Sequence, residues 1–579
     1  MAVSNRQSRE DRFFVKAAPG VDSFASYAPP THPAPIALGL SANEGAYSNV
    51  GPALQGLRPD VIRRYPDTTE LEADIAAYNG VNREQVIATA GADDALWRIM
   101  RSVCASGRNV ILPVPTFEML DRYIIRNQAT PRYIEWLSGD YPIDAVCSAV
   151  NCATSAICVV SPNSPTGAVA TEAQIRRLCE SFPRVLIVLD QAYAEYADID
   201  LASVALEYPN AVVTQTFSKA WGLAGLRVGY AMGNPRVIDW LRAVGQPYAV
   251  SVASIDAARH ALARGQEDMR RHVHSVRTTV DKLVELSKTL ALSPRPSQAN
   301  FVLLETPKAE WIADALAGLG ISIRRYGKDP LLKDSIRVSC PEQDANWGAL
   351  SHGLVSSVDP QGFIFDMDGV LADTSASFDH AVLKTAASFG FPISEQALWG
   401  ARAAGGANDD WALTQRLISD AGRVLPLDDV TKRFQAIYRG TDSVSGLRDN
   451  EKLLVDRFWL ADLAGRFPLA VVTGRPKVDA EYFLKLHQLE PYFSVVISRD
   501  DAPMKPAPDP VLLAMKRLSI RRAWMFGDTP DDVRAARSSG VIPVGIRPPG
   551  AVKGYDQVLL KSGAAQVWDS VMKLTDFIG

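Results

Sequence analysis

Short apolar runs alternate with longer amphipathic stretches along most of the 579-residue chain. In its first half, compact apolar runs predict strands at 110–113, 156–160, 185–189 and 211–215. Helical patterns such as 171–181 lie between these runs. This alternation predicts βαβ units and a mostly parallel sheet.

Two later segments extend the first pattern. Residues 250–290 have a long helical pattern that is polar on one side. The runs 300–304 and 335–339 then predict strands of a smaller α+β subdomain.

A second α/β pattern begins at residue 363. Its apolar runs predict strands at 363–365, 469–472, 495–497, 523–526 and 541–544. The interval 375–455 contains no comparable run and predicts helices inserted after the first strand. A chain of this length exceeds one hydrophobic core, so we expect more than one α/β domain.

The domain boundaries follow from these patterns and from local composition. Residues 1–35 are rich in Pro, Ala and Ser and predict an N-terminal arm. We expect a first domain over 36–353, a linker over 354–362 and a second domain over 363–579. Within the second domain a cap is expected at about 376–455.

Composition narrows the function classes. Hydrophobic residues make up 47% of the chain and charged residues 22%, as in ordinary globular proteins. The net charge of −4 argues against binding to nucleic acid or to an anionic membrane. We find no signal-peptide pattern and no run of about 18 apolar residues. The six cysteines form no C-x-x-C pair, which favours reduced, buried thiols in a cytoplasmic protein.

A phosphate-binding cage is predicted around one lysine after the run 211–215. Thr216 and Ser218 offer hydroxyls and Arg227 offers a guanidinium beside Lys219. Such a cage suits a phosphate monoester held next to an amine nucleophile. Upstream, the backbone N–H groups of Ala92 and Asp93 would bind the same phosphate at a helix N-terminus, with the Asp93 side chain as helix cap.

A buried carboxylate is predicted at the end of the run 185–189. Asp190 at that position requires a cationic partner, which the pyridinium nitrogen of pyridoxal phosphate would supply. Tyr193 could hydrogen-bond the ring hydroxyl of that cofactor, and Phe117 could stack on its face.

Residues 36–350 resemble fold-type I pyridoxal phosphate enzymes, and most closely the histidinol-phosphate aminotransferase family. The resemblance is carried by several motifs in family order: Asn43-Glu44, Arg64-Tyr65-Pro66-Asp67, Ser161-Pro-Asn-Ser-Pro-Thr-Gly167, Ser218-Lys219 and Gly225-Leu-Arg227. It implies that Lys219 forms the Schiff base and shuttles the proton, and that Arg337 binds an anionic end of the substrate. It also implies that Tyr65 reaches the cofactor phosphate of a neighbouring subunit in a homodimer.

The motif at 161–167 departs from that family. Asn163 is retained and is expected near the cofactor, but Ser164 stands where an asparagine usually bonds the ring oxygen. Gln191 likewise replaces a common glutamate after Asp190. A reaction other than transamination therefore stays open.

Two aspartates at spacing two follow the run 363–365. In an extended strand the carboxylates of Asp366 and Asp368 point to the same side, and Mg²⁺ shared with a substrate phosphate would offset their repulsion. A carboxylate nucleophile with cationic clamps suits phosphoryl transfer.

Residues 362–575 look like the haloacid dehalogenase superfamily, with all four of its motifs. The resemblance implies that Asp366 is the nucleophile and Asp368 the general acid and then base. Further residues take roles by the same resemblance: Thr473, Gly474 and Lys505 hold the phosphoryl group, Asp528 binds magnesium with Asp366 and Asp368, and Asp532 is a supporting acid.

The helical insertion resembles a subclass I cap that excludes water. Its stretch 405–411 is the candidate for leaving-group recognition. For Asp373 and Asp531 we expect solvated side chains.

These expectations describe a bifunctional enzyme of histidine biosynthesis. A phosphorylated keto substrate, imidazole-acetol phosphate, would be transaminated with glutamate to histidinol phosphate and then hydrolysed to histidinol. Four alternatives remain: another phosphorylated amino compound, a decarboxylase in place of the aminotransferase, one idle regulatory domain, or a phosphonate-cleaving hydrolase.

Overall fold

The computed structural model describes residue 26 and residues 31–45, 50–406, 409–441 and 443–578. Contacts divide the chain into two units. The first contains Leu40–Thr306 and Tyr326–Asp344, and the second contains Thr31–Gly39, Pro307–Arg325 and Ala345–Gly579. Most of the predicted N-terminal arm lies outside the described residues.

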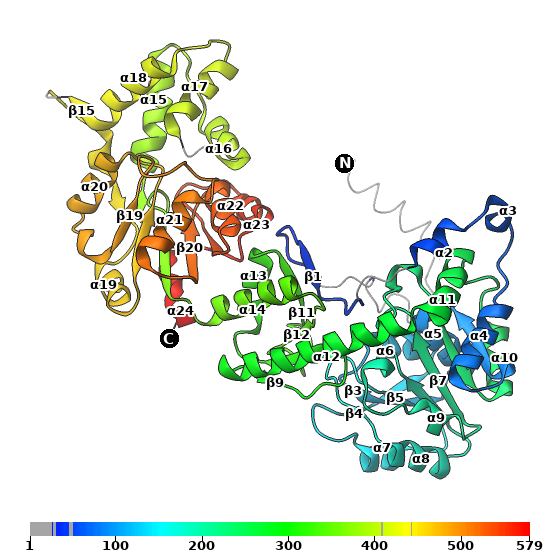
Figure 1. Cartoon of the computed structure of the whole chain (residues 1–579). Coiled ribbons are helices and arrows are strands. Elements are labelled where there is room, and N and C mark those ends of the chain that lie inside the picture. The colour runs from blue at the N-terminus through cyan, green and yellow to red at the C-terminus, as the bar shows by residue number, and fades with distance from the viewer. Residues whose placement is uncertain (1–25, 27–30, 46–49, 407–408, 442, 579) are drawn as a thin grey trace, which may run out of the picture. The chain divides into compact units, whose positions relative to one another are not determined.

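A seven-stranded sheet forms the centre of the first unit (Figure 1). Its strands, in spatial order, are β2 (Val86–Thr89), β8 (Gly229–Gly233), β7 (Ala211–Thr216), β6 (Leu186–Asp190), β5 (Thr154–Val160), β3 (Asn109–Val114) and β4 (Thr130–Glu135). Only β8 runs antiparallel to its neighbours. The predicted mostly parallel sheet is confirmed, because its strands are buried apolar runs.

In the described part of the first unit nine helices lie before residue 245, and most of those from residue 69 onward contact strands of this sheet. They are α2 (Gly51–Gln55), α3 (Pro59–Ile62), α4 (Thr69–Asn79), α5 (Gly91–Val103), α6 (Glu118–Arg126), α7 (Ile143–Ala149), α8 (Glu172–Ser181), α9 (Ala202–Ala205) and α10 (Pro235–Val244). One apolar core joins α5, α6 and α10 to the strands. It includes Leu186 and Val188 of β6 and Val212 of β7.

The predicted helical segment 250–290 is two helices. α11 (Val252–Arg264) ends at Gly265, and α12 (Gln266–Thr289) continues from there. After it, β10 (Phe301–Glu305) pairs antiparallel with β12 (Ser335–Ser339) and with β9 (Ser293–Pro294). Both strands predicted for the smaller subdomain are present.

The second unit is built on a parallel six-stranded sheet. Its spatial order is β19 (Val495–Ile497), β18 (Leu469–Val472), β13 (Gly362–Phe365), β20 (Ala523–Gly527), β21 (Ile542–Ile546) and β22 (Val567–Trp568). Its helices are α19 (Arg457–Arg466), α20 (Lys477–Leu486), α21 (Asp509–Leu518), α22 (Pro530–Ser538), α23 (Tyr555–Ser562) and α24 (Thr575–Ile578). All five predicted strands are present, whereas the two-residue β22 was not predicted.

The inserted segment folds into four helices that lie together at one end of the second unit (Figure 1). These are α15 (His380–Ser388), α16 (Glu395–Ala404), α17 (Asp410–Asp420) and α18 (Leu427–Arg439), with their own apolar core. The chain enters through β14 (Ala372–Asp373) and a π-helical turn, η4 (Ser375–Asp379). It leaves through β17 (Lys452–Leu453), which pairs with β14.

The linker predicted over 354–362 is wrong in its first half. α14 (Asp344–Val358) continues through it, and only three residues separate this helix from β13. The helix persists because Leu350 and Leu354 are fully buried and because two indole nitrogens bond its last carbonyls.

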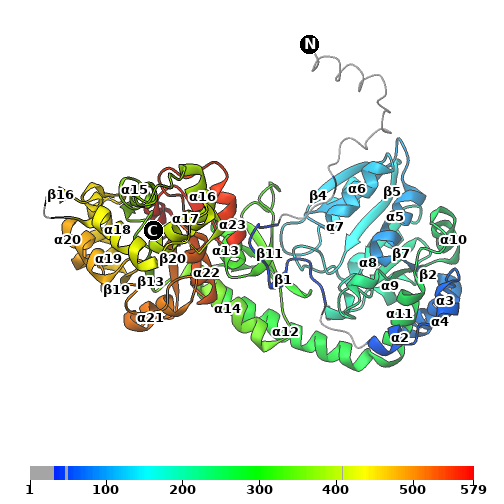
Figure 2. The same cartoon turned by 90° about the horizontal axis from the view of Figure 1, so that it is seen from above.

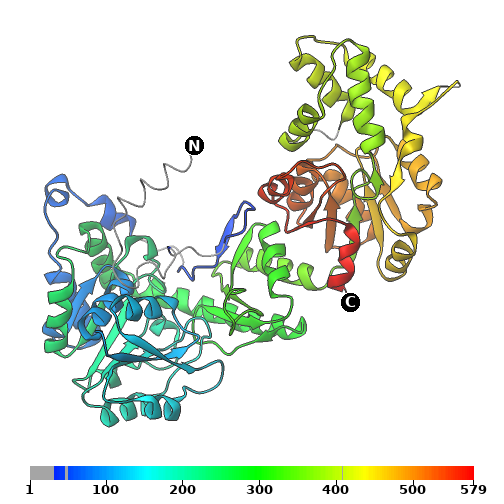
Figure 3. The same cartoon turned by 180° about the vertical axis from the view of Figure 1, so that it is seen from behind.

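The second unit also takes in residues predicted for the first domain. α13 (Ala309–Gly318) and β11 (Ile321–Arg325) belong to it, and α13 contacts β21. Figures 2 and 3 show the green helix α13 next to the red helices of the second unit, among them α23. Trp311 of α13 packs on Trp524 and Trp568 with ring centroids 4.4 and 5.9 Å apart. A boundary drawn at residue 353 therefore misses this packing.

Two further expectations can be compared with the structure. Among the described residues no helix is long and apolar enough to cross a membrane. All six cysteines are free thiols. Three of them are buried, but Cys152 is exposed, contrary to the expectation of buried thiols.

Candidate active sites

The first candidate site lies where β6 and β7 end. Asp190 is buried, and its Oδ1 accepts hydrogen bonds from Thr214 Oγ1 at 3.1 Å and from the Ala192 N–H at 3.2 Å. Burial raises the pKa of Asp190 to about 6. Within the described residues no cationic side chain forms an ion pair with it. A buried carboxylate in this state fits a cationic ring nitrogen.

Lys219 and Tyr193 lie close to each other at this site. Lys219 Nζ donates to the carbonyl of Ala42 at 3.1 Å and lies 5.7 Å from the Tyr193 ring centroid. The Tyr193 hydroxyl accepts a bond from Asn43 Nδ2 at 2.9 Å. Asn43 was noticed in the sequence only as part of a motif. Its contact with Tyr193 depends on a fold that joins residues 150 positions apart.

The side chains predicted to form the phosphate cage lie within hydrogen-bonding distance of one another. Thr216 Oγ1 donates to Ser218 Oγ at 2.9 Å, and Arg227 Nη1 donates to the same oxygen at 3.4 Å. A Cβ atom at Gly91 would lie 2.8 Å from Arg227 Nη2, and one at Gly229 would lie 2.8 Å from the Ala92 nitrogen. Both glycines therefore keep the cage open for an anion.

The predicted cap role of the Asp93 side chain is wrong. No side chain caps α5 at its Ala90 N-cap. Asp93 Oδ2 instead pairs with Arg227 Nη2 at 3.0 Å, and the neighbouring Asp94 accepts from the Ala90 N–H. Its attraction to the guanidinium determines the orientation of Asp93.

Ser164, which stands where the family usually has asparagine, is hydrogen-bonded to Arg337 in the structure. Ser164 Oγ accepts a bond from Arg337 Nη1 at 3.1 Å, while Arg337 Nη2 donates to the carbonyl of Ser41 at 2.7 Å. Arg337 Nε is buried with no partner in the described part of the chain. A substrate anion could satisfy this donor.

Asn163 does not present its amide to the site. Its Nδ2 donates to the carbonyl of Pro115 and to Thr166 Oγ1, and its Oδ1 accepts from Thr116 Oγ1. It therefore shapes the loop rather than offering a free group to a cofactor. Phe117 packs at the edge of the main core, and Tyr65 is 80% exposed and stacked on Tyr248.

The second candidate site is a cluster of carboxylates at the ends of β13 and β20. Oxygens of Asp366, Asp528 and Asp532 lie within 4.8 Å of one another. Burial, with Asp532 next in effect, raises the pKa of Asp366 to about 8 and that of Asp528 well above its usual value. Lys505 Nζ lies 2.8 Å from Asp366 Oδ1 and 2.5 Å from Asp532 Oδ1. One ammonium cannot balance three carboxylates, so the cluster fits an added divalent cation.

The predicted metal set needs one correction. Asp532, expected only as a supporting acid, belongs to the cluster, whereas the side chain of Asp368 is outside it. Asp368 Oδ1 instead accepts two bonds from Arg475, from Nε at 2.8 Å and Nη2 at 2.5 Å. Spacing along one strand could not reveal an arginine 107 residues away.

Two aspartates expected in solvent are not there. Asp531 is buried, where it accepts from the Gly406 N–H and pairs with Arg534. Asp373 is half-buried, bonds Ser375 and lines the pocket over the cluster. Gly406, just beyond the end of cap helix α16, holds Asp531, and a turn at the entrance to the cap holds Asp373; neither contact was visible in the sequence.

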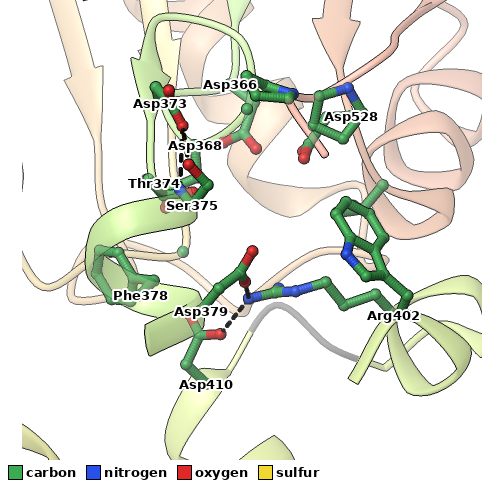
Figure 4. Close-up of a pocket in the computed structure, with 16 residues that line it drawn as sticks. Asp366, Asp368, Asp373, Thr374, Ser375, Phe378, Asp379, Arg402, Asp410 and Asp528 are labelled. Carbon is green, nitrogen blue, oxygen red and sulfur yellow. Dashed lines mark hydrogen bonds and ion pairs between the residues drawn. The ribbon is translucent and has the colours of Figure 1, made fainter. Parts of the chain in front are cut away.

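The pocket over the cluster has a charged wall contributed by the cap (Figure 4). Arg402 of α16 donates to Asp379 Oδ1 at 2.7 Å and to Asp410 Oδ1 at 2.9 Å. Burial raises the pKa of Asp410 to about 6. This wall faces Asp366 and Asp528 across the pocket, which Gly474 also lines.

The predicted leaving-group stretch 405–411 reaches this pocket only in part. Asp410 lines the pocket over the cluster, whereas Asp409 caps α17 and pairs with Arg499. Asn408 lies outside the described residues. Thr473 Oγ1 accepts from the Arg475 N–H, in the loop after β18.

The two halves of the chain match two different families of known proteins. Residues 36–346 match the family model "aminotransferase class I and II", and residues 360–540 match "haloacid dehalogenase-like hydrolase". A histidinol-phosphate aminotransferase of Dehalococcoides mccartyi is 34% identical over 308 residues, which is 52% of this chain and 85% of that protein.

Another relative and a solved structure match different shares of the chain. An imidazoleglycerol-phosphate dehydratase of Phytophthora nicotianae is 38% identical over 227 residues, or 38% of this chain. The match spans about half (49%) of that protein's length. The crystal structure of histidinol-phosphate aminotransferase from Sinorhizobium meliloti, in complex with pyridoxal 5′-phosphate, aligns with a TM-score of 0.55 and 24% identity, covering 60% of this chain and 98% of that one. This structural likeness, at 24% identity, shows that the two chains share a fold.

Proposed function

Because this chain belongs to the aminotransferase class I and II family and carries a haloacid dehalogenase-like hydrolase domain, we propose that it performs two consecutive reactions on one metabolite. The first transfers an amino group from glutamate to a phosphorylated keto compound. The second hydrolyses the phosphate ester of the amine product. The supporting observation is that each half has a buried, charge-unbalanced carboxylate site suited to the group its reaction needs.

Pyridoxal phosphate fits the first site. Asp190 would pair with the ring nitrogen, Tyr193 would contact the ring hydroxyl, and Thr216, Ser218 and Arg227 would hold the phosphate. When bound, the cofactor supplies an electron sink for the carbon next to nitrogen. The Lys219 amine would bind the cofactor. It would also move the proton between the substrate carbon and the cofactor carbon that lie on either side of the transferred nitrogen.

Substrate binding in the first site falls to Arg337. Its buried, unpartnered Nε and its cationic charge suit a carboxylate or phosphate on the substrate. The exposed Tyr65 is free to contact a neighbouring subunit. We therefore propose a homodimer in which Tyr65 completes the partner's phosphate cage.

The second reaction begins with attack by Asp366. A bond forms between its carboxylate oxygen and phosphorus while the ester oxygen leaves with a proton from Asp368. Water then attacks the aspartyl phosphate and gives a proton to Asp368, which releases phosphate and restores Asp366. Lys505 holds the phosphoryl oxygens, and Mg²⁺ at Asp366, Asp528 and Asp532 would neutralise the charge of the cluster.

The charge of the pocket supports the order amine first, phosphate second. Among its described lining residues are six carboxylates and one guanidinium, that of Arg402. Arg402 is already shared between Asp379 and Asp410, so it is not free to bind an anionic leaving group. An ammonium on the leaving group would meet an acidic wall, whereas the keto precursor lacks that charge.

The relatives suggest the substrate. Histidinol-phosphate aminotransferases are among them, which supports imidazole-acetol phosphate as the keto compound and histidinol as the final product. Histidine biosynthesis in the cytoplasm fits that assignment and the six free thiols.

Ser164 favours one second candidate function for the first site. With a serine bound to Arg337 in place of the usual asparagine, the first site could instead decarboxylate a phosphorylated amino acid. Incubation with glutamate and a panel of phosphorylated ketones, following 2-oxoglutarate and inorganic phosphate, tests the proposal. Absence of phosphate release from every amine product in the presence of Mg²⁺ would refute the sequence of steps. Carbon dioxide without 2-oxoglutarate would establish the decarboxylase.

A further inference from the structure

Arg475 directly follows the predicted phosphate-binding pair Thr473-Gly474 and takes no direct part in the proposed phosphoryl transfer. Its side chain is only 1% exposed. Two of its nitrogens, Nε and Nη2, donate to the same oxygen of Asp368. Because both donors belong to one rigid guanidinium and meet at Oδ1, they fix the position of that oxygen and so the direction in which the carboxylate points.

The other end of Arg475 contacts the cap and its connections. Nη1 donates to Glu451 Oε2 at 2.9 Å and to the Tyr438 hydroxyl at 3.2 Å. Glu451 Oε1 in turn accepts from Ser377 Oγ at 2.8 Å and from the Tyr438 hydroxyl at 3.0 Å. Ser377 lies where the chain enters the cap, Glu451 lies where it leaves, and Tyr438 lies in α18.

The guanidinium is also held from its sides. Its Cζ lies 4.9 Å from the Phe378 ring centroid and 5.2 Å from that of Phe483. Removing a charge so enclosed would leave Asp368 and the buried Glu451 without a cation, which is costly. The pair of Asp368 and Arg475 is therefore held in one geometry from both the core and the cap.

We propose that Arg475 is a positioning residue of the phosphatase half, which holds Asp368 against the leaving oxygen when both cap connections are in place. This inference rests on the phosphatase reaction proposed above. Closure of the cap then completes the proton donor, because Ser377, Tyr438 and Glu451 hold Arg475, and Arg475 holds Asp368. A cap that opens would release the donor.

The test compares two esters with different need for a proton. An aryl ester, p-nitrophenyl phosphate, leaves without one, whereas an alkyl ester such as phosphoethanolamine requires it. General acid catalysis is worth roughly 10²–10⁴-fold. For Arg475→Gln we expect kcat to fall about 100-fold on the alkyl ester and less than about 10-fold on the aryl ester, with Arg475→Lys in between.

The matched control is Arg439→Gln. Arg439 is the last residue of α18 and, like Arg475, donates from two nitrogens to a buried carboxylate, but its partner is Asp479 and not Asp368. It should leave the ratio of the two rates at the wild-type value. Equal losses on both esters for Arg475→Gln and Arg475→Lys, in protein that is still folded at the assay temperature, would overturn the positioning role. If the wild type hydrolyses neither ester, the proposed phosphatase function fails instead.

The link to the cap has its own measurement. Glu451→Gln keeps the shape of the side chain but removes its charge. Like Arg475→Gln, it should lower kcat on the alkyl ester more than kcat on the aryl ester. Because both act through one network, the double variant should lose less than the product of the two single losses. Losses that multiply independently would show that the cap connection does not act through Arg475.

Discussion

Trp311→Ala is predicted to destabilise the phosphatase unit, although Trp311 lies inside the aminotransferase match. The side chain is 3% exposed, and its ring lies 4.4, 5.9 and 4.9 Å from those of Trp524, Trp568 and Phe577. Its Nε1 also donates to the carbonyl of Ser357 at 2.8 Å. All of these partners belong to the second unit.

The expected loss can be worked from this packing. Truncating a buried tryptophan to alanine costs about 3–5 kcal/mol, through lost burial and the cavity left behind. In a unit of about 250 residues, 1 kcal/mol lowers the unfolding temperature by about 2–4 °C. The second unit should therefore unfold about 6–20 °C earlier.

The assay follows the two units by separate signals in the full chain. Loss of phosphatase activity after heating reports the second unit, and loss of the bound-cofactor absorbance reports the first. Trp240→Ala is the control, since Trp240 lies on α10 of the first unit and is 42% exposed. If Trp311→Ala lowers only the cofactor signal and spares the phosphatase, the assignment of α13 to the second unit is wrong.

Three further predictions concern the sites. Lys219→Ala should abolish the bound-cofactor absorbance and spare phosphate release, and Asp366→Asn should do the reverse; loss of both activities in either folded variant would contradict independent sites. Burial raises the pKa of Asp190 in the folded, cofactor-free protein to about 6, against a usual 3.8. The free energy of unfolding should therefore fall by about 3 kcal/mol as the pH rises from below 4 to above 6, because the folded state holds the Asp190 proton more tightly than the unfolded state does. Urea unfolding across this pH range should show that fall, and Asp190→Asn should remove it. Mg²⁺ at 100 times its dissociation constant should stabilise the second unit by about 2.7 kcal/mol, measured as a rise in unfolding temperature, and Asp528→Asn should reduce that rise.

The sequence predicted those parts of the sites that lie at the ends of strands. Asp190, Lys219, Asp366 and Asp528 were found because each follows a buried apolar run, and parallel strands bring such ends to one edge. Motif spacing also indicated the phosphate cage. These features are local, so short windows of sequence contain them.

The missing parts depend on contacts between distant segments. Asn43 meets Tyr193 across 150 positions, and Arg475 meets Asp368 across 107. Neither pair has a local pattern that would reveal it. The misplaced linker has the same origin, because the indole nitrogens of Trp311 and Trp524, distant in sequence, bond the last carbonyls of α14.

The packing of α13 and α14 gives the fusion a consequence beyond bringing two sites onto one chain. The interval 347–359, which separates the two family matches, lies almost wholly within α14. The carbonyls of Ser356 and Ser357 accept from the indoles of Trp524 and Trp311. A cut there would remove Trp311 from the second unit and expose Trp524 and Trp568, each now 1% exposed. The two candidate sites use separate residues, but we predict that the second unit is less stable when it lacks the part of the aminotransferase match that contains α13.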